Sequence, residues 1–135
     1  MSRQRSERGQ SVNLFALLVS GALMLTVGLV VDGGQKVTAT ARAEAAAAGA
    51  ARAASNAAAT SQLAGGTDVA TAVRAAKTYL DGEPGVTGSV TVRAGVVGVR
   101  TEAAAPTLFL SMIGIDHVEA AGSAEANIVA TGEPR

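Results

Sequence analysis

Side chains that could perform chemistry are few in this chain of 135 residues. His117 is the only histidine, and there is no cysteine. A multi-histidine or thiolate metal site therefore cannot be assembled, and one histidine is too little to argue a Ser-His-Asp set. A surface or strand-end side chain is the favoured interpretation of His117.

The acidic and glycine residues form no recognisable site either. Glu119 and Glu125 are six residues apart in a predicted strand, or roughly 20 Å, which is too far for a glycosidase pair. Asp32 follows an apolar run, where a helix-end or interface carboxylate is the simplest interpretation. Gly33-Gly34 and Gly65-Gly66 lack the Lys-Ser/Thr of a phosphate-binding loop. We therefore predict no catalytic, cofactor-binding or metal-binding residue, no enzyme and no small-molecule substrate.

Composition excludes further classes of function. The net charge is zero, which gives no electrostatic case for nucleic acid. The chain has one Tyr and two Phe and is rich in Ala and Gly. A core of Ala and Val buries little apolar area, at about 25 cal/mol per Å². We therefore predict low intrinsic stability for the region from Gly34 onward, which would gain order from the membrane or from neighbours.

The clearest segment is the uncharged run SVNLFALLVSGALMLTVGLVV at residues 11–31. Its length of about 21 residues, at ~1.5 Å per residue, matches the ~30 Å hydrocarbon core of a bilayer. Three arginines precede it, so the positive-inside rule predicts a cytoplasmic N-terminus. The predicted protein is single-pass in the cell membrane, with a basic tail or leader (1–10), a transmembrane helix (11–31) and an extracytoplasmic domain (32–135).

A cleaved signal peptide is the alternative interpretation of the same segment. A secreted small binding protein would then remain after loss of the first ~34 residues. Signal peptides have shorter apolar regions, of ~7–15 residues, and a small-residue cleavage site that VVDGGQ matches poorly. A retained span is therefore favoured. Within it, Gly21 and Gly28 share one helical face and could pack against another helix in the membrane, although glycines are also simply common in such spans.

Two helices are predicted after the span. The Ala-rich stretch 35–63 contains no proline and few charges, which favours a helix continuing from the membrane, loosened at Gly33-Gly34, over disorder. Gly65-Gly66 ends it, and Thr67 or Asp68 caps a second helix reaching Leu80. The apolar face of this second helix consists of Val69, Ala72, Val73, Ala76 and Leu80.

Alternating side chains then predict a small antiparallel sheet. The turn DGEPG precedes a strand at 86–93, Ala94-Gly95 makes a tight turn, and a second strand covers 97–100. Pro106 begins a short apolar helix, TLFLSMIG. A last strand runs from Ile115 to about Ala130, bulged at Gly122, before a loose GEPR tail. The fold class is thus α+β, in the order α-α-β-β-α-β.

Four stretches of the chain resemble the TadE/TadG-like family of tight-adherence (type IVb-like) pilus assembly proteins. They are the basic tail ending in Glu7-Arg8-Gly9-Gln10, the span LFALLVSGALMLTVGLVVDGG, the helix KVTATARAEAAAAGAARAA, and the C-terminal strands with TLFLSMIGI and VEAAGSAEANI. The chain is similar to a short TadE-type member. Its abundant Ala and Arg fit a GC-rich, actinobacterial genome.

The resemblance implies a pilin-like fold and a minor pilin or pseudopilin that packs with other pilin-like subunits, pilus assembly proteins and membrane lipid. It also implies a prepilin peptidase that cuts after a glycine before the apolar segment, here at Gly9-Gln10. The chain departs from the pilin pattern at Leu14, where an acidic residue usually stands. The alternative, that Gly9 merely links tail and span, stays open.

Overall fold

The computed structural model describes residues 4–66 and 68–128, with side chains from residue 10 onward. The α+β class and the predicted order of elements are confirmed. Thr67, the end of the last predicted strand and the GEPR tail lie outside the described residues. The elements are α1 (Gln4–Leu63), α2 (Val69–Asp81), β1 (Val86–Arg93), β2 (Val96–Pro106), the 3₁₀ helix η1 (Leu110–Ile113) and β3 (His117–Asn127).

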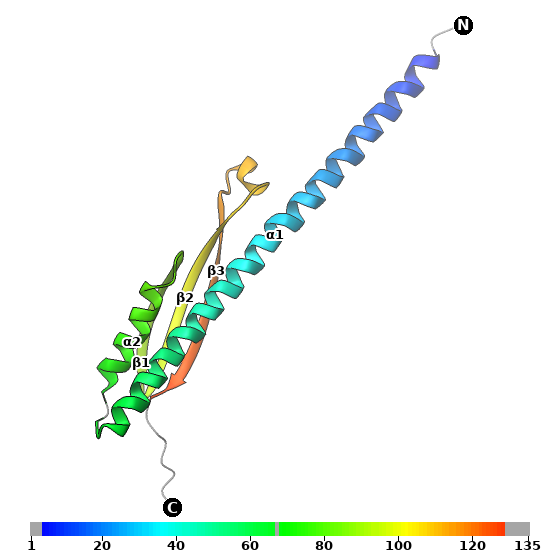
Figure 1. Cartoon of the computed structure of the whole chain (residues 1–135). Helices are drawn as coiled ribbons and strands as arrows, with labels where there is room; N and C mark the ends of the chain where they lie inside the picture. Colours follow the sequence, from blue (N-terminus) through cyan, green and yellow to red (C-terminus); the bar gives the residue numbers. More distant parts are fainter. Residues whose placement is uncertain (1–3, 67, 129–135) are drawn as a thin grey trace, which may run out of the picture.

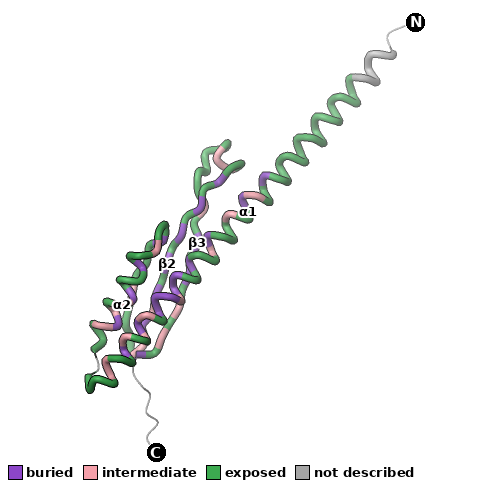
Figure 2. Tube along the Cα trace, viewed as in Figure 1, coloured by how far each residue is buried: buried purple, intermediate pink, exposed green. Residues whose placement is uncertain are grey.

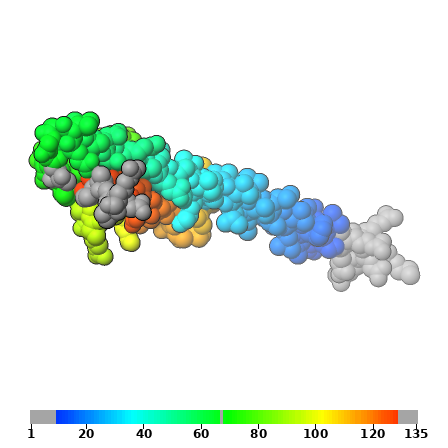
Figure 3. Space-filling view, turned by 90° about the horizontal axis from the view of Figure 1, so that it is seen from below, coloured from blue at the N-terminus to red at the C-terminus, as the bar shows by residue number. Residues whose placement is uncertain are grey.

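Helix α1 is one continuous helix of 60 residues, or ~90 Å. The expected loosening at Gly33-Gly34 is wrong, because both glycines are α-helical. Each glycine costs about 1 kcal/mol relative to alanine, which is less than the cost of interrupting a helix with strong formers on both sides. The N-terminal half of α1 projects away from the domain, as Figures 1 and 3 show.

Strands β1, β2 and β3 form an antiparallel sheet in that order. Ala94 and Gly95 both have positive φ, 48° and 78°, as a two-residue hairpin turn requires. Three predictions for this region are wrong. Strand β2 does not stop at residue 100 but continues to Pro106. Pro106 therefore ends a strand and does not begin a helix. Strand β3 pairs with β2 in an unbroken register, without a bulge at Gly122. Strand β2 extends because its apolar alternation continues through Ala103 and Ala105, which are buried.

The core lies between one face of the sheet and the C-terminal half of α1. Helix α1 packs across β2 and β3, and α2 packs beside it against β1 (Figures 1 and 2). The buried stripe of α1 consists of alanines and Gly49, small residues that allow the helix to approach its neighbours closely. Its alanines are Ala39, Ala43, Ala46, Ala47, Ala50, Ala51, Ala54 and Ala58.

Helix α2 starts as predicted, because the Asp68 side chain accepts the N–H of Ala70. Its buried face is narrower than expected and consists of Ala72, Ala76 and Leu80. Val69 is exposed. The Leu80 side chain fits against the sheet because Gly88 has no Cβ, which would lie 2.8 Å from Leu80 Cδ1.

Candidate functional site

The apolar half of α1 makes the first part of the site. Its large side chains are exposed along the predicted span, including Leu17, Met24 and Leu29 (Figure 2). Among the described residues, α1 is the one helix long and apolar enough to cross a membrane. An exposed surface of this kind is costly in water and favourable in lipid. The coarse prediction of a membrane-compatible N-terminal helix is therefore confirmed.

Asp32 joins this helix to the rest of the domain. Its buried carboxylate accepts backbone N–H groups from Leu108 at 2.8 Å, Phe109 at 3.1 Å and Leu110 at 2.7 Å. The carboxylate thus caps the start of η1 from another element, where free N–H groups would otherwise lack acceptors. The hydrogen bond from Leu108, with those from Leu110 and Phe109, lowers the pKa of Asp32 despite the opposing effect of burial.

Gly28, one turn earlier in α1, supports the same contact. A Cβ on Gly28 would lie 2.5 Å from Cγ of Phe109 and 2.7 Å from its Cδ1, so the aromatic ring rests on the helix backbone. A Cβ on Gly21 would have no neighbouring side chain within 4 Å. The two glycines that the sequence placed on one face thus have different surroundings. Gly28 is covered by the chain's own Phe109, and Gly21 is open.

The segment 107–116 connects β2 to β3 and is called the tip loop below. Sequence reasoning predicted a short apolar helix in it but missed its contact with Asp32. Asp32 and Leu108 are 76 residues apart, so no local pattern links them. The available signal was the uncharged, apolar composition of the segment itself, TLFLSMIGI. The threonine at its start is anchored by two bonds, with its N–H donated to Asp116 O and its hydroxyl to Ile115 O.

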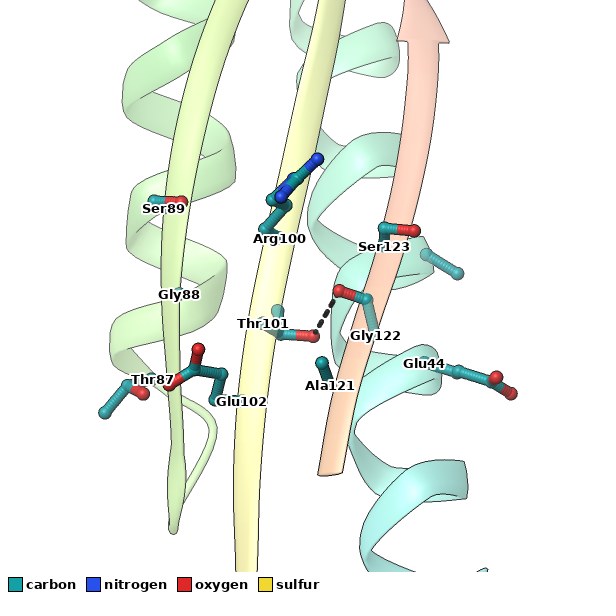
Figure 4. A pocket seen from close by; sticks show the side chains of 11 residues that line it. Glu44, Thr87, Gly88, Ser89, Arg100, Thr101, Glu102, Ala121, Gly122 and Ser123 are labelled. Carbon is teal, nitrogen blue, oxygen red and sulfur yellow. Dashed lines mark hydrogen bonds between the residues drawn. The ribbon is translucent and has the colours of Figure 1, made fainter. Parts of the chain in front are cut away.

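The closest approach of helix and sheet lies further along α1. The buried Thr101 hydroxyl donates to Ala43 O of α1 at 2.6 Å, and Gly122 O lies 3.4 Å away (Figure 4). A Cβ on Gly122 would meet the backbone of Ala43 and lie 2.5 Å from Glu44 N. Gly122 is therefore required for close packing, which explains a glycine that sequence reasoning had assigned to a bulge.

An open depression lies across the three strands, and Glu44 and Ala48 of α1 also line it. Exposed side chains of Ser89, Arg100 and Ser123 form one row across the three strands, and Glu102 lies beside them (Figure 4). His117 is exposed at the start of β3, with Nε2 3.7 Å from the Glu119 carboxylate. Within the described part of the chain, no three His, Cys, Asp or Glu residues gather as a metal site would need.

The Gly9-Gln10 bond lies within α1, near its start. Nothing in the geometry bears on its cleavage, which stays a prediction. No family model, curated protein or solved structure shows a significant match to this chain.

Proposed function

We propose that this protein is a membrane-anchored structural subunit of a tight-adherence-type pilus or a related secretion apparatus, a minor pilin or pseudopilin without catalysis. The observation that carries the proposal is α1 itself. One helix has an exposed apolar N-terminal half and an alanine-lined C-terminal half that forms the spine of a small α+β domain. A continuous helix of this kind suits a subunit that packs with its neighbours both in the membrane and outside it.

The contacts of Asp32 and Gly28 support a retained span. Both residues fall in the segment that signal-peptide cleavage near residue 34 would remove, yet they hold the tip loop of the folded domain. The resemblance of the basic tail, span and Ala-rich helix to the TadE/TadG-like family supplies the assembly role. On this proposal the N-terminus is cytoplasmic, the domain extracytoplasmic, and the partners are lipid and other pilin-like subunits.

The first test is the N-terminal residue of the protein from native membranes, by intact mass and N-terminal peptide mapping. A start at Gln10 would support cleavage by a prepilin peptidase and packing into a filament. A start at Met1 or Ser2 would support a fixed scaffold at the base of the apparatus. Mature protein starting beyond Asp32 in the culture supernatant would contradict the proposal and favour the secreted binding protein.

The second test concerns assembly. Because the chain has no cysteine, Gly21→Cys provides a single cross-linking position on the open face of the span. We expect disulfide cross-links to the same or related subunits in native membranes, and loss of pili or secretion on deletion of the gene. A protein that stays monomeric in membranes, and whose deletion leaves both processes intact, would refute the structural role.

A further inference from the structure

We propose that the tip loop is a second membrane-contacting element, which inserts into the outer interface of the lipid bilayer beside the span and fixes the domain against the membrane surface. The inference rests on the anchoring part of the proposed function and not on pilus assembly. The occupant of this apolar surface is lipid.

The contacts of the tip loop with α1 fix its position along the axis of that helix. The Phe109 ring rests on Gly28, three residues before the end of the uncharged run at residue 31, or ~4.5 Å along the axis. The Asp32 carboxylate holds the adjoining N–H groups directly after that run. If residues 11–31 fill the hydrocarbon core, the tip loop must lie at its outer boundary. Figure 1 shows it at the end of the sheet nearest the apolar half of α1.

From Thr107 to Ile115, the exposed side chains of the loop are apolar. Met112 is 82% exposed, Ile113 72% and Leu108 60%, while Phe109 lies partly against α1. No charged residue occurs from Thr107 to Ile115. A cluster of this kind is unfavourable in water. The Phe109 ring of this cluster lies against Gly28 of the span, so the medium that covers the span also reaches the loop.

The backbone of the loop suits a medium poor in water, in which unpaired polar groups are costly. The Asp32 carboxylate takes three N–H groups that a short loop would otherwise expose. The Ser111 hydroxyl donates to Leu108 O at 2.7 Å, so that side chain is also paired. Bonded N–H groups within the chain are those of Thr107, Leu108, Phe109, Leu110, Met112, Gly114 and Ile115.

Charged groups begin directly after Ile115, as the headgroup region requires. Lys36, one turn after Asp32 in α1, donates through Nζ to Glu119 O of β3 at 3.0 Å. Asp116, His117 and Glu119 lie at the same end of the sheet. The transition from apolar to charged residues thus occurs at one level on both α1 and β3. Such a shared boundary is expected of a surface that meets a membrane.

The test uses the full-length chain, whose lack of cysteine permits single labelling positions. Met112→Cys carries an environment-sensitive fluorophore in vesicles of phosphatidylcholine and phosphatidylglycerol, with brominated phosphatidylcholine as the quencher. Leu25→Cys in the span is the positive control. Thr91→Cys, exposed near the opposite end of the sheet, is the negative control. We expect lipid quenching at Met112 to be at least half that at Leu25, with none at Thr91.

Each other outcome overturns the proposal in a distinguishable way. Quenching at Leu25 without quenching at Met112 would leave the anchor intact and refute loop insertion. Absence of quenching at Leu25 would refute the anchor and the loop together. A Met112 probe whose emission reports an apolar environment, but which brominated lipid does not quench at any protein-to-lipid ratio, would assign the loop to a second copy of the chain. As a matched variant, Met112→Asp should weaken the tip's lipid contact without removing the protein from the vesicles.

Discussion

At the scale of single residues, Asp32 connects the apolar half of α1 to the tip loop of the domain. A carboxylate that follows an apolar helix usually lies at the boundary with water and is solvated there. Here it is 2% exposed and binds three backbone N–H groups from a segment far along the chain. These bonds favour its charged form and lower its pKa. The tip loop should therefore depend on the ionisation of one side chain.

We predict that the docking of the tip loop is lost in acid. Because the pKa of Asp32 is lowered on folding, its contribution is complete above the ordinary value of 3.8 and disappears as pH falls through the lower folded pKa. Protection factors of the amides of Leu108, Phe109 and Leu110 should thus fall below about pH 4 in the micelle-bound protein. Asp32→Asn should show the same low protection at neutral pH.

The control for this experiment is Asp116→Asn in the same loop. Asp116 accepts the N–H of Thr107 through its backbone carbonyl, which the substitution keeps. In Asp116→Asn, the protection factors of the Leu108, Phe109 and Leu110 amides should match those of the unmodified protein. Undiminished protection in Asp32→Asn at neutral pH would contradict the role assigned to the Asp32 carboxylate.

At the scale of elements, the packing of α1 on the sheet is set by small residues on both sides. The alanine stripe of α1 faces strands whose inward positions include Gly122 and Thr101. Close approach lets Thr101 reach the helix backbone at Ala43, a contact that larger side chains would prevent. Each alanine buries little area, so stability depends on the fit being kept along the whole length of the stripe.

We predict that Gly122→Ala destabilises the protein by about 1–3 kcal/mol, as overpacking does in a close-packed core. The new methyl group would meet backbone atoms of Ala43 and Glu44, which cannot move aside as a flexible side chain would. Urea unfolding in micelles, followed by circular dichroism, measures the change. Gly34→Ala is the matched control, because its Cβ has no side chain within 4 Å, and it should stabilise α1 by about 0.5–1 kcal/mol. Equal stability of the two variants would contradict the proposed close contact.

At the scale of the whole molecule, one helix provides both a segment long and apolar enough to cross a membrane and the spine of the domain. The domain has no large aromatic core, and its fully buried side chains of greatest volume are Val97, Val99, Thr101 and Asp32. The last of these stands next to the span. The tip loop of the domain is thus held by Gly28 and Asp32, which lie toward the apolar half of α1. Figure 3 shows this half of the helix extending beyond the domain.

We predict that a fragment of residues 34–135 is only marginally stable. It lacks both Gly28 and Asp32, so the tip loop loses its attachment to α1. Urea unfolding of the fragment should give a free energy below about 5 kcal/mol, the lower end of the usual range. The full chain in micelles should retain its fold at urea concentrations that unfold the fragment. A highly stable monomeric fragment would contradict the predicted dependence on the membrane end.

Local patterns in the sequence determined the type of nearly every element. The uncharged run at 11–31 predicts the exposed apolar helix, Asp68 the start of α2, and alternation the strand at 86–93 with its Ala94-Gly95 turn. These features depend on neighbouring residues, through helix capping, side-chain period and turn geometry. Side-chain periodicity indicates secondary structure less clearly where the residues are small. The predicted second strand was therefore shorter than β2, and the helix was wrongly predicted to loosen at Gly33-Gly34.

Tertiary structure alone decided which distant residues meet. The capping of the tip loop by Asp32, the Phe109 ring on Gly28 and the approach of Gly122 to Ala43 join positions between 76 and 81 residues apart. A glycine in the sequence is compatible with a bulge, a turn or a close contact, and only the neighbour selects among them. The physical reason is that these contacts depend on how α1 lies across the sheet, which single-chain periodicity does not specify. The membrane-compatible helix was thus readable from sequence, and the site at its end was not.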